Sequence, residues 1–180
     1  MKISNENLYE LLGIDTGELG CMMAKFSTPT RLLNEIPENL LYHDPDDPGE
    51  YGKVFDSHVS LLYGLLKPAH ETREAVDLVL RDLSFYEKTL FGSADWFSPS
   101  DQPYDVLYIP PVGKAPFVDA HQRLSRLPHV NLYPVYTPHL TLAYVKKGAA
   151  REAAWFVNRI AKACNPDYRT LWFHGYDYGR

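Results

Sequence analysis

The chain has 180 residues and a mass of 20.6 kDa, with 45% apolar and 23% charged side chains, which predicts one globular domain over residues 1–180. This composition excludes a fibrous or a disordered chain. The net charge of −5 is divided unevenly, because residues 1–122 carry 9 basic and 20 acidic side chains, whereas residues 123–180 carry 9 basic and 3 acidic ones. We therefore expect no long nucleic acid as a partner, but a small anion can bind toward the C-terminal third.

The sequence also indicates where the protein works. Its apolar runs are far shorter than the ~20 residues that cross a bilayer, and residues 1–10 are polar, so we expect neither a membrane span nor a secretory signal. Cys21 and Cys164 are the only cysteines and suggest neither a disulfide framework nor a cysteine-rich zinc site. The expected location is therefore the cytoplasm.

Hydrophobic periodicity and turn residues predict an α+β fold of mostly antiparallel sheet with helices on one side. Residues 43–52 combine acids with prolines and glycines and predict a surface loop. The expected strands are 20–26, 58–65, 88–97, 104–109, 139–145 and 169–178, and the expected helices are 30–36, 71–83, 117–127 and 151–163.

One pattern occurs twice in the chain. Residues 58–63 read HVSLLY and residues 139–144 read HLTLAY, 81 positions apart (139 − 58), and each predicted strand is followed by a helix. Strict alternation in a strand would place His58 and Ser60 on one face, with His139 and Thr141 placed likewise, and would turn the tyrosine of each repeat to the opposite face. The repeat predicts two similar lobes.

A His followed two positions later by Ser or Thr does not by itself identify such a motif. His70-Glu71-Thr72 has the same spacing but lies in a charged stretch at a predicted helix start. The strand context and the matching apolar residues distinguish the motifs at 58–60 and 139–141 from this one. The alternative interpretation of these two motifs is that His58 and His139 are structural histidines in two similar strands. If the lobes face each other, two imidazoles and two hydroxyls surround one cavity.

Such a set suits phosphodiester cleavage without a metal. One neutral imidazole accepts a proton from the nucleophile and one protonated imidazole donates a proton to the leaving oxygen, since the ordinary imidazole pKa of ~6.5 allows both forms near neutrality. The hydroxyls of Ser60 and Thr141 would donate hydrogen bonds to the phosphate oxygens. The sequence contains no HExxH, GxxxxGK[ST] or GxSxG motif, so we expect neither a metal nor another cofactor.

These residues resemble the 2H phosphoesterases, also called LigT-like or 2′-5′ RNA ligase-like proteins, which have two His-x-Thr/Ser motifs in pseudo-symmetric lobes. The resemblance covers nearly the whole chain, and LYH at 41–43, HVSLLYG at 58–64 and TPHLTLAYV at 137–145 look most like members from phages and their bacterial relatives. Ser60 stands where threonine is commoner, so this hydroxyl lacks the methyl group that restricts χ1.

The resemblance implies a bilobal α+β fold with helices outside and a metal-free active site in a central cleft. It implies activity on 2′,3′-cyclic, 2′-5′ or 3′-5′ phosphodiester bonds of short or cyclic oligonucleotides. Some phage members destroy cyclic oligonucleotide messengers of bacterial antiviral immunity, the anti-CBASS activity, whereas other members process RNA ends. The motifs do not choose between these roles.

Aromatic and basic residues outside the motifs are candidate substrate contacts. We expect Trp96 and Trp172 to stack on bases and Lys25 to reach the phosphate, whereas Trp155 lies at a helical position that predicts packing in the core. The alternatives from other classes are a module that sequesters a nucleotide without cleaving it and a structural protein with a vestigial cleft. The sequence does not assign the acid and the base, the bases recognised or the oligomeric state.

Overall fold

The computed structural model describes residues 19–46, 49, 51–67, 70–83, 85–131, 135–163 and 166–179. The polar N-terminal segment at residues 1–10 and Cys164 lie outside these residues. Cys21 is a buried free thiol. Within the described part of the chain, no helix combines the length and the apolarity that a membrane span requires.

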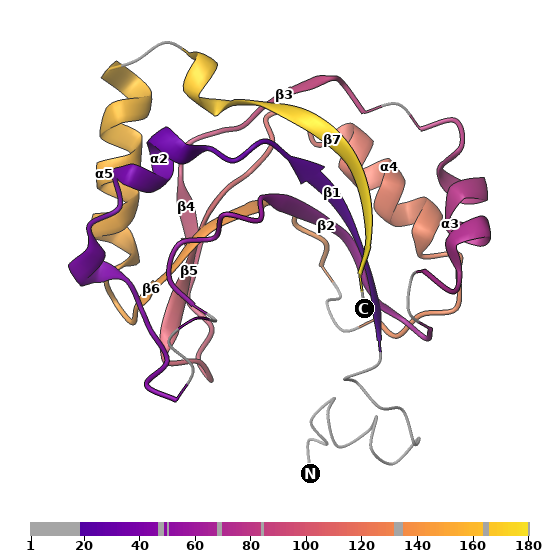
Figure 1. The fold of residues 1–180 in the computed structure, drawn as a ribbon, viewed down its shortest axis with the longest axis horizontal. Helices are drawn as coiled ribbons and strands as arrows, with labels where there is room; N and C mark the ends of the chain where they lie inside the picture. The colour runs from indigo at the N-terminus through magenta and orange to yellow at the C-terminus, as the bar shows by residue number, and fades with distance from the viewer. Residues whose placement is uncertain are drawn as a thin grey trace.

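Seven antiparallel strands form one curved sheet in the order β3-β7-β1-β2-β6-β5-β4 (Figure 1). The strands are β1 Gly20–Phe26, β2 His58–Leu65, β3 Lys88–Leu90, β4 Asp95–Phe97, β5 Tyr104–Ile109, β6 Leu140–Lys146 and β7 Thr170–Gly179. The helices are α2 Thr30–Asn34, η2 Glu38–Leu40, α3 Arg73–Leu80, α4 Ala115–Leu124, α5 Ala150–Ala163 and η3 Pro166–Arg169. The α+β fold class predicted from the sequence is confirmed.

The helices lie on the outer side of the arched sheet and leave its inner side uncovered by helix (Figure 1). Helix α4 packs on β2 and α3 packs on α4, whereas α5 packs on the other end of the sheet, at β4, β5 and β6. Rings of Phe26, Phe91, Phe117 and Phe173 pack together in the core near β1 and β7. Burial of these apolar side chains holds the helices against the outer face.

The sheet consists of a four-stranded and a three-stranded half that meet between β2 and β6. These two strands share a single residue pair, Val59 with Leu140. Farther along β6 the backbone instead bonds to residues 42–54: Tyr42 N donates to Tyr144 O (3.0 Å) and Val54 N donates to Leu142 O (2.8 Å). The two predicted lobes are therefore halves of one continuous sheet.

The expected strand at residues 88–97 is wrong in one respect, because it forms two strands at opposite edges of the sheet. β3 pairs with β7, and β4 pairs with β5. Between them Phe91 is fully buried and Gly92 N donates to Pro110 O (2.7 Å), so the chain turns away from β7 there. Gly92-Ser93 is a turn signal that the strand prediction passed over.

The prediction that Trp155 packs in the core is also wrong, since its side chain is 55% exposed. The buried stripe of α5 comprises Ala150, Ala153, Ala154 and Val157, and position 155 lies off this stripe. The Arg159 guanidinium covers the Trp155 ring at 5.0 Å from the ring centroid.

A stability prediction follows from Gly64 in β2. Its φ is +107°, and a Cβ at this position would lie 2.3 Å from the carbonyl oxygen of Val130, whose amide donates to Gly64 O (2.7 Å). Gly64→Ala should therefore lower the free energy of unfolding by at least about 1–3 kcal/mol, measured by urea denaturation. The matched control is Gly113→Ala, because nothing lies within 4 Å of a Cβ there. Equal stability of the two variants would contradict this prediction.

Candidate active site

The four motif residues lie on one face of the sheet. Because β2 and β6 run antiparallel and pair at Val59 and Leu140, His58 lies across from Thr141 and Ser60 lies across from His139. All four side chains are half-buried, whereas Val59 and Leu140 are fully buried on the opposite, helix-covered side. We call the face that carries these four residues the inner face.

Each motif histidine is fixed by the same local hydrogen bond. His58 Nδ1 lies 2.8 Å from Asp56 O, and His139 Nδ1 lies 2.7 Å from Thr137 O. A carbonyl can only accept, so Nδ1 carries the hydrogen in both rings. The neutral form of each ring therefore has its lone pair on Nε2, which is the atom that accepts or donates a proton.

The two imidazoles differ in their surroundings. The rings of Phe97 and Tyr108 pack edge-on to His139, with centroid distances of 4.9 and 5.2 Å. Burial lowers the pKa of His139, the Thr137 carbonyl opposes part of this shift, and nearby His58 lowers the pKa further. The neutral form of His139 is therefore favoured, and a positive charge on His58 disfavours one on His139.

His58 has charged neighbours instead. Asp56 Oδ2 lies 3.9 Å from its Nδ1, and Lys25 lies directly across from His58 on β1. The Lys25 ammonium pairs with Asp56 and lies 3.4 Å from Asp177 Oδ2. Lys25 thus lies beside the motif residues, and its contact with a phosphate stays a prediction.

The two predicted tryptophan contacts are placed differently. Trp96 neighbours Phe97 in β4, and because Phe97 contacts His139, Trp96 points to the opposite face of that strand. Trp172 lies on β7 beside β3, with Lys88 Nζ 4.2 Å from its ring centroid. A role for either ring in base stacking stays a prediction.

An extra residue in β2 interrupts its alternation. Met22 of β1 pairs with Leu62 and the next residue, Met23, pairs with Ser60, so Leu61 is inserted into β2 as a β-bulge. Leu61 and Leu62 are consequently both buried.

The same insertion occurs in β6. Leu107 of β5 pairs with Ala143 and the next residue, Tyr108, pairs with Thr141, so Leu142 is the extra residue. Leu142 and Ala143 are both fully buried. The two repeats thus share a β-bulge as well as the sequence motif.

The bulges correct one expectation. Strict alternation predicted that Tyr63 and Tyr144 point away from the histidines, but the inserted residues return both side chains to the inner face, where Tyr63 is 38% exposed. His70, the comparison residue, is exposed and precedes α3 rather than lying in a strand.

Tyr136 and His121 also contact the backbone of the first motif, and the sequence analysis did not identify either of them. Tyr136, just before the second motif, donates from its hydroxyl to Ser60 O (2.9 Å) and stacks on His121, whose Nδ1 donates to Leu61 O (2.8 Å). Burial raises the pKa of Tyr136 above its ordinary range, so it stays a neutral donor. Tyr136 thereby connects the segment that precedes the second motif to the backbone of the first motif.

Cys21 lies on the inner face next to Ser60. Burial raises the pKa of the Cys21 thiol to about 11, and a hydrogen bond with the Ser60 side chain opposes part of this shift. The thiol is therefore protonated at neutral pH. Among the described residues, no group of three or more His, Cys, Asp or Glu side chains is arranged to hold a metal ion.

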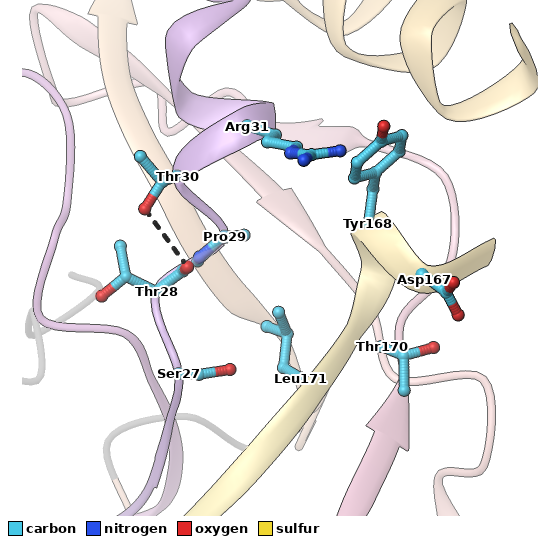
Figure 2. A pocket seen from close by; sticks show the side chains of 9 residues that line it. All are labelled: Ser27, Thr28, Pro29, Thr30, Arg31, Asp167, Tyr168, Thr170 and Leu171. Atoms are coloured by element: carbon cyan, nitrogen blue, oxygen red, sulfur yellow. Dashed lines mark hydrogen bonds between the residues drawn. The ribbon is translucent and has the colours of Figure 1, made fainter. Parts of the chain in front are cut away.

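A separate surface pocket of about 530 Å³ lies where β1 leads into α2 and η3 leads into β7 (Figure 2). Arg31 points at the ring of Tyr168, with its guanidinium carbon 4.3 Å from the ring centroid. None of the residues that line this pocket belongs to the predicted site.

The comparisons with known proteins agree with this fold. The profile of the 2′-5′ RNA ligase superfamily matches residues 31–165. The chain therefore belongs to the 2′-5′ RNA ligase superfamily, whose members are the 2H phosphoesterases. No curated protein sequence matches the chain.

Solved structures of Usb1 from Kluyveromyces marxianus are similar in fold. One has a TM-score of 0.58 and 9% sequence identity, and the alignment covers 90% of this chain and 94% of that one. A second, described as Usb1 with uridine monophosphate, has a TM-score of 0.49 and 9% identity over 86% of this chain and 82% of that one.

The surroundings of His139 generate a pH prediction. Followed by NMR of its ring protons, His139 should titrate below the ordinary imidazole value of about 6.5, because burial disfavours the cation. Phe97→Ala removes one ring from its surroundings and should raise the midpoint. Trp96→Ala, on the opposite face of the same strand, should leave it unchanged. A midpoint at or above 6.5 in the unmodified protein, or equal shifts in both variants, would contradict this account.

Proposed function

We propose that the protein is a metal-independent phosphodiesterase that uses His58, Ser60, His139 and Thr141. The observation that carries this proposal is the placement of two Nδ1-anchored imidazoles and two hydroxyls around the single pair of β2 and β6. Membership of a phosphoesterase superfamily supports the reaction class.

The different surroundings of the histidines support a division of roles. His139, packed against Phe97 and Tyr108 and with a lowered pKa, acts as the base that takes a proton from a 2′-hydroxyl or from water at Nε2. His58, beside the Asp56 carboxylate, acts as the acid that gives a proton to the leaving oxygen. The carboxylate compensates the charge that His58 carries before this transfer.

Ser60 and Thr141 bind the non-bridging phosphate oxygens. Ser60 lies across from His139 and Thr141 lies across from His58 on the neighbouring strand. A phosphate bound by both hydroxyls would therefore lie close to both imidazoles. Removing a donor that acts mainly in the transition state costs about 10²–10³-fold in kcat.

The substrates that we propose are short or cyclic oligonucleotides with 2′,3′-cyclic, 2′-5′ or 3′-5′ phosphodiester bonds. Two roles follow from such an activity, namely destruction of cyclic oligonucleotide immune messengers by a phage protein and processing of RNA ends. A panel of cyclic messengers, linear dinucleotides and nucleoside 2′,3′-cyclic phosphates, with product analysis, separates these roles. A 2′,3′-cyclic product that precedes the hydrolysed end identifies a 2′-hydroxyl nucleophile.

The histidines provide the test of catalysis. His58→Ala and His139→Ala should each lower kcat by at least ~10²-fold, and the double variant should lose much less than the product, because the two groups act in one proton-transfer sequence. Both variants should bind a non-hydrolysable dinucleotide within about tenfold of the unmodified protein. Normal turnover combined with a loss of binding would instead identify the histidines as contacts of a sequestering module.

Removal of metals tests the other half of the proposal. General acid–base catalysis by two imidazoles needs no metal, so activity should survive exhaustive chelation with EDTA. The control is the same treatment followed by addition of Mg²⁺, Mn²⁺ or Zn²⁺, which should not increase the rate. Abolition by EDTA with recovery on addition of one of these ions would refute the metal-free mechanism.

A further inference from the structure

The two bulges place an aromatic ring on the inner face at the same position of each repeat. Tyr63 follows Ser60 by three residues and Tyr144 follows Thr141 by three residues. Without the inserted leucines both rings would face the helix-covered side. β-Bulges near active sites commonly re-aim a side chain in this way.

We propose that Tyr63 and Tyr144 are the stacking platforms for the two bases that flank the scissile phosphate. The substrate class is then a phosphodiester with a nucleoside on each side, rather than a single nucleoside cyclic phosphate. This inference rests on the proposed function, which places the phosphate at the histidines.

The antiparallel strands give the platforms their positions. Because β2 and β6 run in opposite directions from the pair of Val59 and Leu140, Tyr63 and Tyr144 lie on opposite sides of the histidines. At ~3.3 Å per residue, each tyrosine lies about 10 Å along its strand from the nearer motif hydroxyl. A tyrosine side chain and a nucleoside joined to the phosphate together bridge that distance.

The platform at Tyr144 is built into a cluster of rings. Tyr51 and Tyr104 pack edge-on to Tyr144, with centroid distances of 5.2 and 5.0 Å, and Tyr42 packs on both of them at 5.2 and 5.4 Å. All four rings are half-buried. This packing fixes the Tyr144 ring before a ligand arrives, which reduces the entropic cost of binding.

The platform at Tyr63 is more open. Tyr63 is 38% exposed, and its neighbour across β1 is the small Cys21, which in turn lies across from Gly179 of β7. Because Tyr63 is the more exposed of the two side chains, the base at Tyr63 should be the more freely variable, and the base at Tyr144 the more tightly restricted.

A purely structural role for the tyrosines makes a different prediction. Rings that only pack residues 42–54 against β6 would affect stability when replaced, but not the preference between substrates. The quantity to measure is therefore the ratio of affinity for a two-base ligand to affinity for a one-base ligand. A loss of folded protein lowers the apparent affinity for both ligands by the same factor and leaves this ratio unchanged.

The experiment compares Tyr63→Leu and Tyr144→Leu with the unmodified protein. The two-base probe is a 2′-deoxy dinucleoside monophosphate, the one-base probe is a 2′-deoxynucleoside 3′-monophosphate, which has no phosphodiester bond, and dissociation constants are measured by calorimetry. Stacking is worth about 1–3 kcal/mol per base, so each variant should weaken the two-base probe about 5- to 150-fold. The one-base probe should be weakened by only one of the two variants, because it occupies one platform.

Conservative and remote variants complete the design. Tyr63→Phe and Tyr144→Phe keep the ring and should bind both probes within about threefold of the unmodified protein, and they replace the leucine variants if those do not fold. Tyr86→Leu, whose side chain is 71% exposed, is the remote control and should have no effect.

The outcomes separate the two proposals. If the protein cleaves phosphodiesters but neither leucine variant changes either probe, or if both leucine variants weaken the two probes by the same factor, the platforms are refuted while the proposed function stands. If the two-base probe is selectively weakened but the unmodified protein cleaves no member of the substrate panel, the platforms stand and the proposed catalysis fails. Where only the phenylalanine variants fold, a loss of two-base binding in them assigns the effect to the hydroxyls and refutes stacking.

Discussion

The pairing of Val59 with Leu140 is the constraint on which the site depends. This one pair fixes the relative register of two strands that are 81 residues apart in the sequence (139 − 58), and so decides that four polar side chains share a face. A shift by one residue would turn one half of the set toward the helices. The fully buried side chains of both paired residues disfavour such a shift, since either would have to leave the core.

The two halves of the site are alike in backbone and different in surroundings. Both imidazoles donate to the carbonyl two residues earlier, so the duplicated element includes the means of orienting the ring. The difference comes from neighbours outside the repeat: Phe97 and Tyr108 reach His139 from β4 and β5, whereas Asp56 lies beside His58. A similar backbone therefore places the two imidazoles in different surroundings, and burial lowers the pKa of His139.

Much of the fold was readable from the sequence because its strands have clear limits. β1, β2 and β5 have the predicted bounds, and β6 and β7 differ by one residue at each end. The bulges at Leu61 and Leu142 were not predicted, because an inserted apolar residue looks like any other strand residue until its partner strand is known. Phe97 and Tyr108 were missed for a similar reason: their contact with His139 depends on the order β4-β5-β6, which local patterns do not encode.

The narrow junction between the halves also has a mechanical consequence. Rotation about a pivot displaces distant points more than near ones. The junction at Val59 and Leu140 adjoins both histidines. Tyr63 and Tyr144 lie farther from it, in opposite directions along β2 and β6. Each histidine is anchored within its own half, at Asp56 or at Thr137, so such a rotation leaves both ring tautomers intact. Such a rotation would change the spacing of Tyr63 and Tyr144 more than that of His58 and His139.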